Sequence, residues 1–146
     1  SAGDVVIKGG NALDYEAGLA GVFIGAPDAG TAGTFMPYVI ARKAHLVIPI
    51  GLEKQIAGSL VEIERQMRRP LPQKAKVPSM WLLRGHLVTE IEALRILTGV
   101  EAFQAGAGGI GGAERGVWLV MRGDPSRLQR GLDLVDSIHG EPAFVE

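Results

Sequence analysis

The amino-acid sequence predicts an α/β fold: a partial, open and mostly parallel sheet with flanking helices, followed by a ferredoxin-like β-α-β-β-α unit. Short apolar runs that end at glycine alternate with stretches of helical periodicity, as strands and helices do. The length of 146 residues suits one or two small domains, and 47% apolar residues are enough to bury a core. Residues 70–79 contain three prolines and predict a linker between residues 1–69 and residues 80–146.

In the first part, we expect strands at residues 4–8, 21–25 and 45–50, each ended by glycine. The continuous apolar run in the third of these strands is typical of a buried parallel strand. A helix is expected over residues 34–43, with Pro37 tolerated in its first turn.

A longer amphipathic helix is expected over residues 52–69, and Pro70 ends it. Its apolar side chains recur at spacings of four, three and four residues, which places them on one helical face. These side chains are Ile56, Leu60, Ile63 and Met67.

In the second part, a strand is expected at residues 80–83, and a capping box at Thr89 and Glu92 begins a helix that Gly99 ends. The expected buried stripe of this helix is Ile91, Leu94 and Leu97.

Strands are then expected at residues 100–105 and 116–122. Asp124 as N-cap and Pro125 at the first position begin a last helix over residues 125–139. The expected core face of this helix is Leu128, Leu132, Val135 and Ile138.

Composition excludes several classes of function. The 15 basic and 16 acidic residues give a net charge of -1, without the basic footprint of a nucleic-acid-binding protein. The absence of cysteine excludes disulfides and thiol nucleophiles, and the three histidines lack metal-ligand spacing, so neither a metal nor a cofactor is expected. No apolar run approaches the ~20 residues of a membrane helix. We therefore expect no membrane partner and a cytoplasmic protein.

Glycine is in excess, at 21 of 146 residues, and the first glycine cluster is a candidate anion site. Gly30 and Gly33 follow a predicted strand and precede a predicted helix, where backbone amides and the helix dipole favour an anion. Thr31 and Thr34 add hydroxyl donors. The alternative is an ordinary strand-to-helix loop, since no nucleotide-binding motif is present.

A second group of candidate residues follows the first and third predicted strands. Lys8, Gly9 and Asn11 come at the end of the first strand, and Glu53 and Lys54 come after the third. Ligands of open α/β sheets bind beyond the carboxyl ends of the strands, which would bring these residues together. The alternative is that Asn11 only forms a turn and Lys8 is solvated.

Gly106, Gly108 and Gly111 match a G-x-G-x-x-G pattern, but a strand follows them instead of the helix that dinucleotide binding requires. We interpret this cluster as a bulged hairpin or a place of close backbone packing, with a subunit interface as a variant. Trp81 and Trp118 are expected in the core.

Residues 4–14, 21–25, 30–33 and 45–50 follow one another as a strand, a turn, a short strand, a Gly-Thr-x-Gly-like turn and a later strand. This order resembles the later half of the sugar-phosphate isomerase and CoA-transferase-like superfamily, over residues 4–54, as found in bacterial proteins. In the isomerases an Asp of the first turn is functional, whereas Asn11 stands here. The earlier strands of the superfamily are missing, so we expect a fragment truncated at its N-terminus.

These patterns lead to the hypothesis of a domain that binds a small anionic metabolite, such as a sugar phosphate or a CoA-like ligand. Its alternative is a non-catalytic module for homo-oligomerisation or ligand sensing, which the Gly-Asp-Pro at residues 123–125 favours because it resembles bacterial microcompartment shell domains. No catalytic set is recognisable, so the reaction and the substrate stay open.

Overall fold

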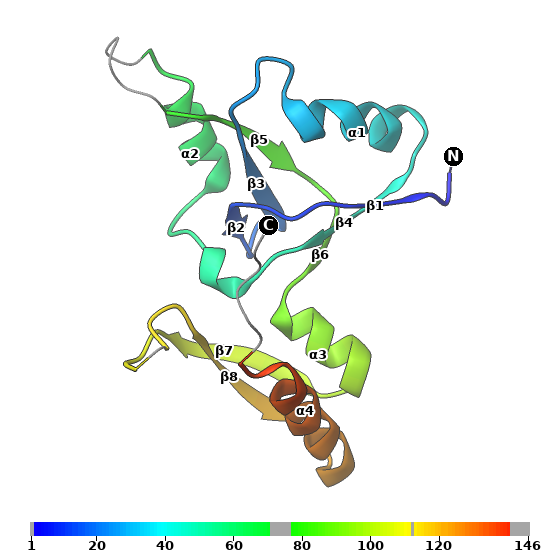
Figure 1. Ribbon diagram of the computed structural model, residues 1–146, viewed down its shortest axis with the longest axis vertical. Coiled ribbons are helices and arrows are strands. Elements are labelled where there is room, and N and C mark those ends of the chain that lie inside the picture. Colours follow the sequence, from blue (N-terminus) through cyan, green and yellow to red (C-terminus); the bar gives the residue numbers. More distant parts are fainter. Residues whose placement is uncertain (1, 71–76, 112, 141–146) are drawn as a thin grey trace. The chain divides into compact units, whose positions relative to one another are not determined.

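The computed structural model describes residues 2–70, 77–111 and 113–140. These residues form a mixed α/β structure with four α-helices and three small sheets, one of them parallel (Figure 1). The chain divides into two compact units, unit 1 (Ser1–Thr89) and unit 2 (Glu90–Glu146). The α/β class predicted from the sequence is thus confirmed.

The parallel sheet of unit 1 consists of β1 (Val5–Ile7), β4 (His45–Pro49) and β6 (His86–Val88), in the order β1-β4-β6. Alternate residues of β4 are buried, as expected for a strand that packs through one face. The sequence analysis missed β6. A Cβ atom at Gly85, just before β6, would lie 2.5 Å from a backbone oxygen of the neighbouring strand, so only glycine permits this close pairing.

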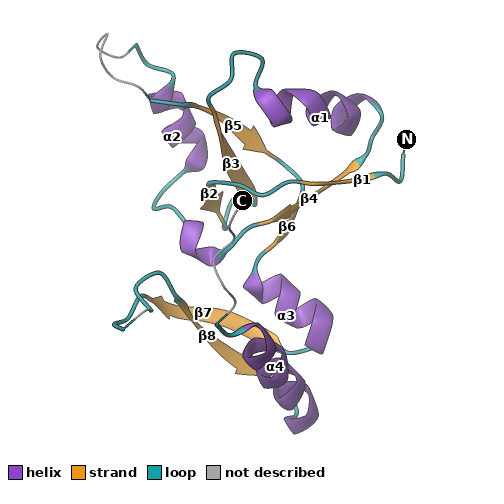
Figure 2. Cartoon of the chain, in the orientation of Figure 1, coloured by secondary structure: helices purple, strands orange, loops and turns teal. Residues whose placement is uncertain are grey.

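The antiparallel sheet of unit 1 consists of β2 (Ala12–Asp14), β3 (Leu19–Ile24) and β5 (Ser79–Leu83), in the order β2-β3-β5 (Figure 2). No strand was predicted at residues 11–14, which were expected only to lead into a polar turn, so β2 was missed. All three residues of β2 are buried, and they pair in register with the start of β3.

The division between the units differs from the predicted linker at residues 70–79. Both β5 and β6 pair with strands of unit 1, so the chain divides after Thr89. Of the predicted linker, residues 71–76 lie outside the described residues.

The helix α1 (Gly30–Ala41) begins four residues before the start predicted from the sequence. The predicted helix over residues 52–69 is wrong in its first half. It divides into a short 3-10 helix η1 (Leu52–Lys54) and the helix α2 (Leu60–Met67). Gly58 has φ +79° and interrupts the helical backbone, and the Ser59 hydroxyl then caps α2 by accepting from the Glu62 amide at 3.4 Å.

Unit 2 has the element order α3 (Glu90–Thr98), β7 (Glu101–Ala107), β8 (Val117–Arg122) and α4 (Pro125–Ile138). The two strands form an antiparallel hairpin, against which α3 and α4 pack. The strand predicted at residues 80–83, before α3, is β5, and both β5 and the following β6 pair with strands of unit 1.

The predicted start of α4 is confirmed, because Asp124 Oδ1 accepts from the amides of Ser126 and Arg127, both at 3.0 Å. The pairing of β7 with β8 shifts register between Gln104 and Gly106, as expected for a bulged hairpin.

The predicted core face of α4 is largely wrong, since three of its four side chains are exposed. The helix approaches β8 through Gly131, where a Cβ atom would lie 2.9 Å from the Met121 sulfur. Leu128 and Leu134, one turn away on each side, are half-buried. The exposed predicted core residues are Leu132, Val135 and Ile138 in α4, together with Leu97 in α3.

Candidate functional site

A small pocket of about 160 Å³ lies in unit 1 where the ends of β1 and β3 meet the beginning of α1. We call it the anion pocket. Lys8 comes from the end of β1, and Gly30 and Thr31 come from the first turn of α1. The other lining residues are Val22, Phe23, Ile24, Gly25, Ala26, Ala29 and Ala32.

The backbone at the start of α1 has an unusual conformation. Ala29 (φ +64°) and Gly30 (φ +52°) are consecutive residues in the left-handed region, and Ala29 occupies the N-cap position, where its methyl group accepts no hydrogen bond. The Asp28 carboxylate accepts from the Gly30 amide at 2.9 Å. Thr31 and Ala32 line the pocket next to this amide.

Glycine is required at position 33 to form this loop. A Cβ atom there would overlap the backbone oxygen of Asp28, one turn earlier. The Gly33 amide donates to the Ala29 oxygen at 3.2 Å, so it closes the first helical turn around the same loop. Gly33 therefore shapes the anion pocket without lining it.

The electrostatics of the pocket favour an anion. The first turn of a helix carries partial positive charge, and Lys8 adds a full positive charge. The Asp28 carboxylate already accepts from the Gly30 amide, and the other first-turn residues that line the pocket are Thr31 and Ala32. The volume is several times the ~30 Å³ of one water molecule, which leaves room for a phosphate or carboxylate group.

The structure brings together only some of the residues selected from the sequence: Lys8, Gly30 and Thr31. The Asn11 Oδ1 accepts from the Phe23 amide at 2.9 Å, so this side chain holds β3 in place. The Thr34 hydroxyl donates to the Gly30 oxygen at 3.2 Å within the helix.

Three further selected residues lie outside the anion pocket. Gly9 lies beside β4, where a Cβ atom would be 3.5 Å from the Pro49 oxygen. Glu53 and Lys54 are exposed on η1.

The role of Ala29 in this loop was not predicted, because alanine rarely adopts positive φ and its presence in a sequence does not indicate that conformation. Val22, Phe23 and Ile24 also line the pocket, and the sequence predicted for them only a short strand.

The shifted pKa values of two carboxyl groups have structural causes outside the pocket. Hydrogen bonds from Arg65 and then Gln66 lower the pKa of Glu62 from 4.5 to about 2, on the surface of α2. The Arg127 amide and then the Ser126 hydroxyl lower the pKa of Asp124 at the start of α4. Both groups stabilise helices, and neither lines the anion pocket.

No family model, curated protein or solved structure matches this chain. Among residues 2–70, 77–111 and 113–140, no three His, Asp or Glu side chains are grouped as metal ligands would be. Over the same ranges, no helix has the length and apolar character needed to cross a membrane. Function therefore has to be inferred from the anion pocket and from the surface of unit 2.

Proposed function

We propose that unit 1 binds a small anionic metabolite, of the sugar phosphate or CoA-like class, through the anion pocket. One observation carries this proposal: Lys8 lines the same pocket as Gly30 and Thr31, so an ammonium group and a helix N-terminus converge on one place. The resemblance of residues 4–54 to the sugar-phosphate isomerase and CoA-transferase-like superfamily supports the same ligand class.

In this proposal the pocket binds the anion and does not itself catalyse a reaction. The Lys8 ammonium neutralises the charge, and the first-turn amides of α1 donate hydrogen bonds to the oxygens. The Thr31 hydroxyl adds one further donor. The apolar wall from β3 excludes water from one side of the anion, which strengthens both kinds of contact.

Replacing Lys8 by glutamine should weaken the binding of ribose 5-phosphate about tenfold, which corresponds to ~1.4 kcal/mol. The substitution removes the positive charge and keeps a side chain of similar length. Isothermal titration calorimetry at low ionic strength measures the dissociation constants. Lys43→Gln is the matched control, because Lys43 follows the opposite end of α1, and it should bind as tightly as the parent chain. Equal affinities for all three proteins would contradict the proposal.

We also propose that unit 2 self-associates, as the assembly alternative requires. Trp118 is 65% exposed, against the expectation that it lies in the core, and Phe103 and Val120 lie beside it on the same face of the hairpin. The Trp118 indole donates to the Gly108 oxygen at 2.8 Å, which holds the ring in place. Arg122 lies on the same face with its guanidinium carbon 5.2 Å from the centre of the Phe103 ring, so Trp118 and Val120 form the uncovered apolar part. A two-stranded sheet with such an exposed apolar surface is marginal in water. The same face of a second copy would cover it.

Val120→Lys should shift this association toward monomer, because the substitution puts two like charges into the joined apolar faces. Light scattering coupled to size-exclusion chromatography, over a series of protein concentrations, measures the mass. Ile110→Lys is the control, because Ile110 is 92% exposed in the hairpin loop and is outside this face. A parent chain that stays monomeric at the highest concentration would refute self-association.

A further inference from the structure

A second and larger pocket, of about 570 Å³, lies beside the anion pocket in unit 1. We call it the Trp81 pocket. Its walls come from the end of β3, the loop before α1, the last turns of α2 and the strand β5. The lining residues are Ile24, Ala29, Glu64, Met67, Arg68, Ser79, Met80, Trp81 and Leu82.

The two pockets are contiguous. Ile24 and Ala29 line both of them, so the two spaces share part of their walls. Trp81 of the larger pocket is also the direct cross-strand partner of Val22, which lines the anion pocket. Paired residues on one face of an antiparallel sheet have Cβ atoms only ~5 Å apart. One ligand of moderate size therefore reaches both pockets.

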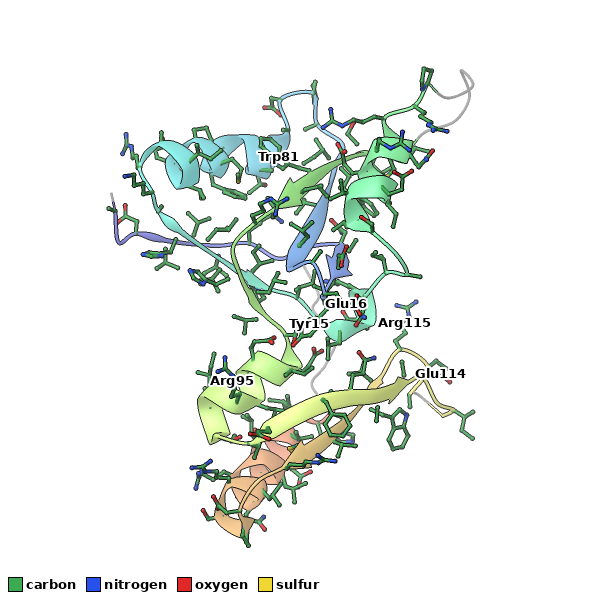
Figure 3. The ribbon with its side chains drawn as sticks, turned by 180° about the vertical axis from the view of Figure 1, so that it is seen from behind. Tyr15, Glu16, Trp81, Arg95, Glu114 and Arg115 are labelled. Atoms are coloured by element: carbon green, nitrogen blue, oxygen red, sulfur yellow. The ribbon has the colours of Figure 1, made fainter. Side chains whose placement is uncertain are left out.

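The shape and chemistry of the Trp81 pocket suit a flat aromatic group. Trp81 is half-buried and lies beside α1 (Figure 3). Its aromatic ring suits stacking against a flat group. The volume lies within the range of pockets that hold small organic ligands.

The polar groups of the pocket indicate a heterocycle with amino groups. Four consecutive residues of β5 line the pocket, and in the described part of the chain β5 pairs only with β3. Its other edge thus presents backbone donors and acceptors. Such a row of backbone donors and acceptors matches the edge of an amino-substituted nucleobase.

We infer that the Trp81 pocket binds the base of a nucleotide-like ligand, whose phosphate occupies the anion pocket. This inference rests on the proposed function, because the phosphate anchors the ligand. The base stacks on Trp81, and its amino and ring nitrogen atoms bond to the edge of β5. The sugar crosses the ridge that Ile24 and Ala29 form between the two pockets.

The test compares AMP, ribose 5-phosphate and adenosine on the full chain. A Trp118→Phe variant leaves Trp81 as the single tryptophan of the chain, so its fluorescence reports on this pocket. AMP should quench the Trp81 fluorescence and bind roughly tenfold more tightly than ribose 5-phosphate, since base stacking contributes about this much. Ribose 5-phosphate should bind without quenching.

A second variant separates this inference from the proposed function. Trp81→Ala should weaken the binding of AMP until its affinity equals that of ribose 5-phosphate. It should leave the affinity for ribose 5-phosphate unchanged. Trp118→Ala should change neither affinity. Equal affinities of the parent chain for AMP and ribose 5-phosphate would overturn the nucleotide inference and keep the anion site. If none of the phosphates binds, both proposals fail. The comparison of ligands on the parent chain needs no substitution, so it decides the question even if Trp81→Ala does not fold.

Discussion

Gly33→Ala is expected to abolish phosphate binding and to lower the free energy of unfolding of unit 1 by about 2 kcal/mol. The added Cβ atom would overlap the backbone oxygen of Asp28, and neither backbone can move without opening the first turn of α1. That turn presents Gly30 and Thr31 to the anion pocket. The substitution should therefore reduce both the free energy of unfolding of unit 1 and its affinity for phosphate.

Urea denaturation in a Trp118→Phe background measures the stability, because Trp81 then reports on unit 1 alone. Calorimetry with ribose 5-phosphate measures the binding. The control for stability is Gly25→Ala, where a Cβ atom would meet open space and the change should stay within ~0.5 kcal/mol. A Gly33→Ala protein as stable as the Gly25→Ala protein would contradict this account of the loop.

The strand, loop and helix around the anion pocket could be predicted from the sequence because their signals are local. An apolar run, a cluster of glycines with two threonines and a helical stretch follow one another over residues 21–43. The position of the helix start was less predictable. Ala29 adopts positive φ because Gly30 and Gly33 allow the chain to turn closely there, and the type of residue at position 29 does not indicate this.

Two short strands could not be predicted from the sequence for a different reason. β2 and β6 have three residues each, which is too few for alternation to be visible. Both form because longer strands already provide a pairing edge: β3 for β2, and β4 for β6. Asn11 was selected as a ligand residue for the same reason, since its hydrogen bond to Phe23 exists only once β3 is beside it.

The division of the chain into two units also depends on long-range strand pairing, which the sequence does not indicate. The prolines at residues 70–79 predict a linker from composition alone. The long-range pairing of β5 with β3, over five residues, overrides this prediction and attaches residues 79–83 to unit 1. A local pattern carries no information about which distant strand will pair.

Asp14 has a role that the sequence did not indicate, because aspartate before a turn reads as a turn former. The residue ends β2 and is only 8% exposed. Its carboxylate accepts from the Ala17 amide and from the Leu60 amide, each at 3.0 Å. Leu60 is the first residue of α2 and is fully buried. One side chain thus fixes a turn, a strand end and a helix N-terminus.

Asp14→Ala should lower the free energy of unfolding of unit 1 by about 3 kcal/mol, because two amides lose a charged acceptor and one of them belongs to a fully buried residue. Asp14→Asn should cost about half as much, since its single carbonyl oxygen satisfies one amide and its amino group faces the other. Urea denaturation followed by Trp81 fluorescence, again in the Trp118→Phe background, measures both.

Glu16→Gln is the matched control for Asp14, because Glu16 lies in the same turn with an exposed side chain (Figure 3). Its effect should remain within ~0.5 kcal/mol. The loss of free energy of unfolding should follow the number of amides left without an acceptor. It should be largest for Asp14→Ala, smaller for Asp14→Asn and smallest for Glu16→Gln. Net charge alone predicts otherwise, because each substitution removes one negative charge and all three would then be equivalent. Equal stabilities would therefore show that the Asp14 hydrogen bonds do not hold α2 against β2.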